Sequence, residues 1–114
     1  MRRIQQSKRF SQATISKNHI YLTGQVAIDN PNGTIGEQTM EVLNRIDTLL
    51  NEAETDKKAI LIANIWLRDM MDYDEMNKIW DNWIIDGYAP ARACVQSVLV
   101  SSFKVEISVV AETP

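Results

Sequence analysis

The chain has 114 residues, of which 45% are hydrophobic and 24% charged, and its formal net charge is −3. This length allows one domain, spanning residues 1–114, around a single hydrophobic core, and the composition is that of an ordinary globular protein. No basic cluster follows the Arg2–Arg3 pair. Nucleic-acid phosphates require a basic face, so we do not expect nucleic acid as a partner.

Composition also bears on location and on metal chemistry. The N-terminal segment is basic but lacks a following apolar stretch, and the longest apolar run, residues 59–67, is too short to cross a bilayer. We therefore expect a cytoplasmic protein with no membrane partner. Cys94 is the only cysteine and His19 the only histidine, which excludes a disulfide framework and leaves a zinc site short of ligands. We therefore expect no metal.

The first part of the chain predicts strands. A short leading strand is expected at residues 2–6, and two further segments, residues 10–15 and 19–26, alternate loosely and are rich in β-forming residues. Lys17-Asn18 is the expected turn between the second and third segments. Asn30-Pro31-Asn32-Gly33 predicts a loop, because Pro cannot donate a backbone hydrogen bond and Gly tolerates positive φ.

Helical spacing begins at Gly36. The apolar stripe of this first helix is expected to comprise Met40, Leu43, Ile46 and Leu50. Residues 59–67 are apolar on both faces, which predicts a central strand covered by helices on at least one side. A second helix is expected over residues 72–85, with Asp72 as its N-cap and Gly87 beyond its end. Its stripe is expected to comprise Tyr73, Met76, Trp80 and Trp83–Ile84.

Two final strands are expected at residues 91–100 and 103–111, joined by a hairpin about Ser101. In that register Gln96 faces Glu106, and Arg92 lies about 13 Å further along, too far for a direct salt bridge. The order of elements predicts an α+β fold, in which a mixed sheet carries two helices on one face. The other face still carries apolar residues, and we expect self-association to cover it.

Arg92 and Glu106 are charged residues within apolar strands, and each has two interpretations. Arg92 either grips a substrate carboxylate through two parallel hydrogen bonds or extends its head from the strand end into solvent. Glu106 either belongs to a solvated strand face or takes part in chemistry. Cys94 shares a strand face with Arg92. No His lies near it in the sequence to form a thiolate, so we interpret it as a small thiol of the core. The residues alone predict a small α+β oligomer with a candidate carboxylate site.

Four segments, in order along nearly the whole chain, resemble the RidA/YjgF/L-PSP family. Pro90-Ala91-Arg92-Ala93-Cys94-Val95, followed by Phe103-Lys104-Val105-Glu106-Ile107, is similar to the family's C-terminal signature. Leu22-Thr23-Gly24-Gln25-Val26 resembles its "TSGQ" segment, and Asp72-Tyr73-Asp74-Glu75-Met76-Asn77 resembles its "DF-x-x-x-N" helix start. Residues 76–83 further resemble a short YoaB-like subgroup.

The resemblance implies a chorismate-mutase-like homotrimer, in which the sheets form a central barrel and the clefts between subunits take 2-imino or 2-keto acids. It implies hydrolysis of reactive enamines and imines, such as 2-aminoacrylate, to 2-keto acids and ammonia without a cofactor. By this resemblance Arg92 would hold the carboxylate, and Glu106 would position or activate the attacking water. The expected pocket lining is Phe10, Thr23, Gly24, Asn77 and Cys94.

The chain departs from the family pattern near its N-terminus. The usual "GPYSQA" is here Lys8-Arg9-Phe10-Ser11-Gln12-Ala13, so Phe10 replaces a pocket Tyr and lacks its hydroxyl, and Thr23 stands where Ser is common. Two other functions stay open. One is a non-catalytic trimer that binds or senses a 2-keto acid. The other is the ribonuclease activity attached to the L-PSP name, against which the acidic net charge and the absence of a His pair argue.

Overall fold

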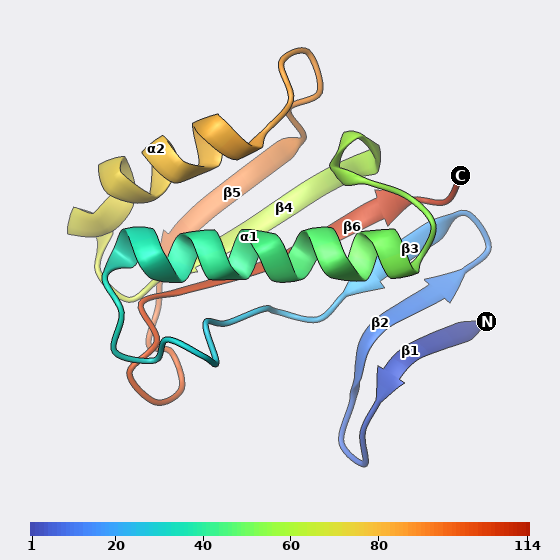
Figure 1. The fold of residues 1–114 in the computed structure, drawn as a ribbon, viewed down its shortest axis with the longest axis horizontal. Helices are drawn as coiled ribbons and strands as arrows, with labels where there is room; N and C mark the ends of the chain where they lie inside the picture. Colours follow the sequence, from blue (N-terminus) through green and yellow to red (C-terminus); the bar gives the residue numbers. More distant parts are fainter.

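One sheet and two helices form two layers in the computed structural model, which describes residues 1–114 (Figure 1). The helices are α1 (Ile35–Glu52) and α2 (Tyr73–Trp83), and both lie on the same face of the sheet. The strands are β1 (Arg2–Gln6), β2 (Ser11–Ser16), β3 (His19–Leu22), β4 (Ile60–Leu67), β5 (Ala91–Gln96) and β6 (Val105–Glu112). The predicted α+β class with two helices on one face is confirmed.

The sheet is mixed, with its strands in the order β1-β2-β3-β6-β4-β5. Every neighbouring pair is antiparallel except β4 and β5, which are parallel and are joined through α2. The predicted hairpin between the last two strands is therefore wrong, because β4 lies between β5 and β6. Glu106 lies opposite Trp66 of β4, and it does not face Gln96. Parallel strands are joined by a long crossover and not by a short turn, so no turn motif in the sequence marks the pairing of β4 with β5.

Arg68 explains how the chain passes from β5 to β6 without a hairpin. Its guanidinium donates to the carbonyls of Leu99, Ser101 and Phe103 at 2.7, 2.8 and 2.7 Å. These bonds fasten the connecting segment across the end of β4. Ser101 does turn the chain, with a φ of 53°, but within this connection and not at a hairpin tip.

Helix α1 begins at a capping box, which the spacing of the apolar residues does not reveal. Thr34 Oγ1 accepts from the amide of Glu37 at 3.1 Å, and the Glu37 carboxylate accepts from the amide of Thr34 at 2.9 Å. Two orphan donors of the first turn are thereby satisfied. The expected stripe is wrong at Met40, which lies at its edge and is 54% exposed. The apolar residues buried on this helix are Val42, Leu43, Ile46, Leu49 and Leu50.

Helix α2 begins at Tyr73 after a 3-10 turn, Met70–Asp72, whose own cap is Asp69. The side chain of Asp72 makes no capping bond, contrary to the prediction, because this turn already leads the backbone into the helix. The helix ends at Trp83, well before Gly87, whose φ is 84°.

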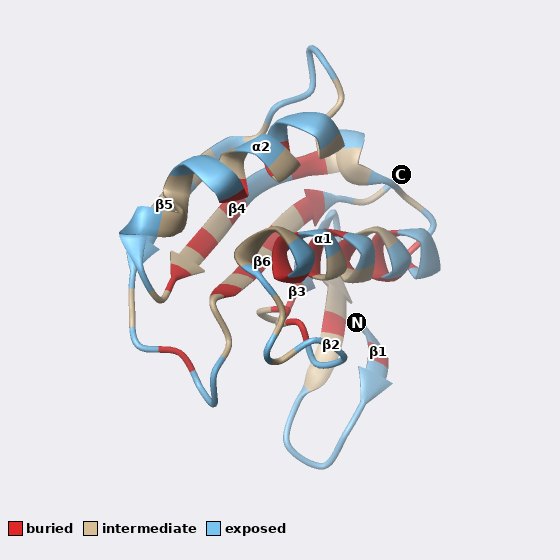
Figure 2. Cartoon of the chain, turned by 60° about the vertical axis from the view of Figure 1, so that its left-hand side comes forward, coloured by how far each residue is buried: buried red, intermediate tan, exposed pale blue.

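The hydrophobic core lies between the sheet and the two helices and contains 21 buried residues. Buried bands alternate with less buried ones along β4 and β6, as strand geometry requires (Figure 2). The opposite face, which we call the open face, has no covering layer in this chain. It exposes Tyr21, Ile62 and Val95 at 47%, 37% and 51%. Neither helix combines the length and hydrophobicity needed to cross a membrane.

Candidate functional site

The seven residues expected at the site fall into two groups in the folded chain. The first group, which we call the cationic half-site, lies on β5 and α2 and comprises Asn77, Arg92 and Cys94. The second group, which we call the acidic half-site, lies beside the ends of β2, β3 and β6 and comprises Phe10, Thr23, Gly24 and Glu106.

The guanidinium of Arg92 is held by α2. Nη1 donates to Oδ1 of Asn77 at 2.8 Å, and Nη2 donates to the hydroxyl of Tyr73 at 3.2 Å. The guanidinium carbon lies 5.3 Å from the ring centre of Trp80, a cation–π contact. Residues 73, 77 and 80 share one face of the helix because they are four and three positions apart. We call Tyr73, Asn77 and Trp80 the α2 clamp.

The charge of Arg92 has no counter-ion within the chain. Both oxygens that accept from it belong to neutral side chains, and the ion pairs of the structure involve Arg45 and Lys78 only. A partly buried cation that is fixed in place but not neutralised is suited to an incoming anion. The planar guanidinium can pair with both oxygens of a carboxylate, which an ammonium group cannot. The head of Arg92 is therefore fastened to α2 and does not extend freely into solvent.

Cys94 follows two residues after Arg92 on the same strand face and packs against the core. Burial raises the pKa of the Cys94 thiol, and the nearby charge of Arg92 offsets only part of this effect. A thiol in this state is a poor nucleophile at neutral pH. No group of three or more His, Cys, Asp or Glu side chains is placed to hold a metal ion.

Glu106 is the charged member of the acidic half-site. It alternates with the buried residues Val105 and Ile107, so its side chain lies on the open face of β6. Burial raises the pKa of the Glu106 carboxyl, and no cation or hydrogen bond within the chain counters this effect. A carboxyl group with a raised pKa is a better proton acceptor near neutral pH than an ordinary Glu.

Gly24 makes room for Glu106. A Cβ placed on Gly24 would lie 2.8 Å from Cδ of Glu106, which is closer than real carbon atoms approach. The glycine thus leaves room for the Glu106 side chain in its present position, and no positive φ is involved. The segment is also fixed by the amide of Thr23, which donates to the carbonyl of Gln12 at 2.9 Å.

Arg92 and Glu106 lie on opposite faces of the sheet. On the central strand β4, Arg92 is opposite Ala63 and Glu106 is opposite Trp66, which are three positions apart. The separation is therefore about 10 Å along the strands and about 10 Å across them, in addition to the thickness of the sheet. A ligand the size of an amino acid cannot touch both groups within one chain.

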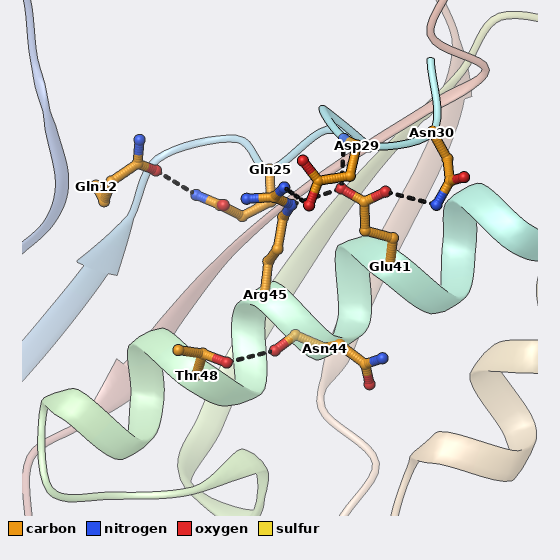
Figure 3. A network of polar contacts seen from close by, with 8 residues as sticks. All are labelled: Gln12, Gln25, Asp29, Asn30, Glu41, Asn44, Arg45 and Thr48. Atoms are coloured by element: carbon orange, nitrogen blue, oxygen red, sulfur yellow. Dashed lines mark hydrogen bonds and ion pairs between the residues drawn. The ribbon is translucent and has the colours of Figure 1, made fainter. Parts of the chain in front are cut away.

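A cavity of about 720 Å³ lies between α1, β2 and the loop that follows β3. Phe10 and Gly24 of the acidic half-site line it, whereas Arg92 and Glu106 do not. Its polar wall is shown in Figure 3. Glu41 accepts from Arg45 at 2.7 Å and from the amide of Asp29 at 3.1 Å. Only the i, i+4 spacing of Glu41 and Arg45 could have indicated this network from the sequence.

These features define an α+β protein with a fixed, uncompensated guanidinium on an edge strand and an isolated carboxyl on the opposite face. The family model described as Endoribonuclease L-PSP matches residues 1–113. The RutC family protein YoaB from Escherichia coli is 40% identical over 110 residues, which are 96% of this chain and 95% of that protein. A RutC family protein from Haemophilus ducreyi is also 40% identical over 110 residues, with 96% and 93% coverage.

Solved structures agree with the sequence comparisons. A YjgF family protein from Neisseria meningitidis superposes with a TM-score of 0.94 at 43% identity, covering 99% of this chain and 94% of that chain. A protein from Pseudomonas aeruginosa superposes with a TM-score of 0.95 at 37% identity, covering 99% and 98%. The chain belongs to the L-PSP family, whose members are also called YjgF or RutC family proteins. The resemblance found in the sequence motifs is thereby confirmed.

Proposed function

We propose that this protein hydrolyses reactive 2-imino acids and their enamine forms, of the 2-aminoacrylate type, to 2-keto acids and ammonia. The observation that carries the proposal is the guanidinium of Arg92, which is fixed by α2 and has no counter-ion. Every 2-imino acid carries one carboxylate that can occupy this position. Membership of the L-PSP family is consistent with the proposed activity.

The proposed reaction needs orientation and one base. With the carboxylate held by Arg92, the carboxylate of Glu106 accepts a proton from water as the water oxygen bonds to the iminium carbon. The protonated Glu106 then returns this proton to the nitrogen and becomes a carboxylate again. The carbon–nitrogen bond breaks and ammonia leaves, while the Glu106 carboxylate accepts the proton of the hydroxyl group as the keto group forms. An iminium carbon is already electrophilic, so no metal or covalent intermediate enters the scheme.

We propose that the active cleft joins two subunits. Arg92 and Glu106 cannot meet within one chain, so the cationic half-site of one subunit would face the acidic half-site of its neighbour. In this arrangement Phe10 and Thr23 of the neighbour line the ligand. The exposed apolar residues of the open face, which a neighbouring sheet would cover, support such an assembly.

Sedimentation equilibrium is expected to give a homotrimer, with three times the chain mass of 13.0 kDa. The physical reason is the open face, because covering the exposed side chains of Tyr21, Ile62 and Val95 removes apolar surface from water and lowers the free energy. The expected assembly is a central barrel of sheets with the helices outside. A stable monomer at micromolar concentration would contradict the prediction.

A shared cleft predicts complementation between two inactive variants. Arg92→Ala and Glu106→Gln trimers should each have at most a small residual activity, but co-expressed subunits should regain activity, because an interface can combine an intact Arg92 with an intact Glu106. Random mixing in equal amounts leaves about one quarter of the clefts intact in a closed cyclic trimer. Differently tagged subunits allow the mixed trimers to be purified before assay. Mixed trimers as inactive as their parents would exclude the shared cleft.

Three candidate functions are separated by one set of assays. Purified protein is given imino acids generated freshly by an amino-acid oxidase, and keto acid release is followed against the spontaneous rate. Accelerated release supports hydrolysis. Stoichiometric binding of a 2-keto acid without acceleration supports a non-catalytic binding trimer. Cleavage of RNA would support the activity in the family model's description, against which the net charge of −3 argues.

A further inference from the structure

The hydroxyl of Tyr73 contacts Arg92 and takes no part in the proposed proton transfers. It accepts a hydrogen bond from Nη2 of Arg92 at 3.2 Å, while the Tyr73 ring lies 5.8 Å from the guanidinium carbon. Tyr73 stands at the first position of α2, where the preceding 3-10 turn fixes the backbone. The ring also packs against the hydrophobic core, so it has little freedom to move.

The contacts of Arg92 determine which of its donors remain for a ligand. A guanidinium has five N–H groups, two on each terminal nitrogen and one on Nε. Asn77 takes one donor from Nη1 and Tyr73 takes one from Nη2, so each terminal nitrogen keeps one. The two bonds together stop rotation of the guanidinium plane. Either bond alone would leave the opposite nitrogen free to swing.

We propose that Tyr73 is a positioning residue that sets the orientation of the Arg92 fork and thereby the affinity for the ligand carboxylate. This inference rests on the proposed function, because it assigns Arg92 the carboxylate. Tyr73 acts through Arg92 and does not itself touch the reacting carbon. Its hydroxyl supplies a neutral oxygen, which fixes the guanidinium without cancelling the positive charge that the ligand needs. A carboxylate at this position would fix Arg92 equally well but would compete with the ligand.

The test compares Tyr73→Phe with the parent protein in binding of 2-oxobutanoate and in imine hydrolysis. Phe keeps the ring, and with it the core packing and the cation–π contact, and removes only the hydroxyl. We expect the Kd for 2-oxobutanoate to rise about tenfold, the scale of one hydrogen bond to a charged group. KM should rise in parallel while kcat stays within about twofold, because the lost interaction acts equally on substrate and transition state.

Two controls separate positioning from a general structural effect. Tyr88→Phe removes a hydroxyl from an exposed Tyr that lies outside the α2 clamp, and its Kd should equal that of the parent. The amide of 2-oxobutanoate lacks the carboxylate, so its weak binding should not change in Tyr73→Phe. The trimer and its thermal midpoint should be preserved in both variants.

Each outcome decides the proposal. An unchanged Kd for 2-oxobutanoate in Tyr73→Phe overturns the role of Tyr73 and leaves the proposed hydrolysis intact. Equal weakening of the keto acid and its amide, or a dissociated trimer, shows a structural role and also overturns it. If the parent binds 2-oxobutanoate but does not hydrolyse imines, a tenfold loss in Tyr73→Phe still supports positioning, while the proposed function fails. If the parent binds no keto acid, both proposals fail.

Discussion

Replacing Arg92 with Ala is expected to abolish the binding of 2-keto acids together with turnover. Truncating one partner of a desolvated charge pair costs about 2–5 kcal/mol, so the affinity should fall by a factor of about 30 or more. Calorimetric titration with 2-oxobutanoate and keto acid release from a freshly generated imine measure the two effects. Binding as tight as in the parent protein would remove Arg92 from the site.

Arg92→Lys belongs to the same prediction, because it keeps the charge and changes the geometry. An ammonium group cannot make two parallel bonds to a carboxylate, and it cannot bridge Asn77 and Tyr73 as the guanidinium does. We therefore expect little rescue. Sedimentation of both variants must show an intact assembly, since a dissociated trimer would destroy any cleft between subunits and imitate the loss of Arg92.

Glu106→Gln is expected to separate catalysis from binding. The amide keeps the shape of the side chain and much of its hydrogen bonding but cannot accept the proton of the attacking water. The rate should fall by a factor on the order of 100 or more, the scale of a general base, while 2-oxobutanoate still binds. Stopped-flow measurement of keto acid release, with calorimetry on the same sample, tests both halves. Turnover at full speed would show that Glu106 is not the base.

The pH profile gives this prediction a second readout. Burial raises the pKa of the Glu106 carboxyl, and the base must be deprotonated to work. The kcat/KM of the parent protein should therefore fall, as the pH is lowered, at a higher pH than an ordinary Glu would produce. Glu106→Gln should lack this acidic limb in its residual rate. The raised pKa also means that the folded state loses stability as the pH rises through this window, a dependence that Glu106→Gln should not show.

The helices and strands could be predicted from the sequence because the spacing of apolar residues reflects which side of each helix or strand is buried. Leu43, Ile46 and Leu50 of α1 are buried where their periodicity placed them, and β6 overlaps the strand expected at residues 103–111. The pairing of β5 was not predictable by this means. Strand periodicity carries no information on which neighbour a strand pairs with, and the turn at Ser101 has the same local signal in a hairpin and in a connection fastened by Arg68.

The candidate site shows the same limit. The predicted hairpin separated Arg92 from Glu106 only by their positions along two adjacent strands. In the structure β4 lies between their strands, and the two side chains are on opposite faces of the sheet. Tyr73 was interpreted as part of an apolar stripe. Its hydroxyl gains a role only when folding brings it to Arg92, 19 residues later in the chain. Spacing along one helix cannot reveal such a contact.

The close approach of Gly24 to Glu106 limits how this pocket could diversify. A side chain at position 24 would occupy the space that the Glu106 carboxyl now takes, so a change there would move the proposed base from its present position. Phe10 lines the same cavity as Gly24 but is under no such restriction, because it is 49% exposed. A lineage under selection for larger or smaller imino acids would therefore accumulate its changes around Phe10, while position 24 stayed glycine.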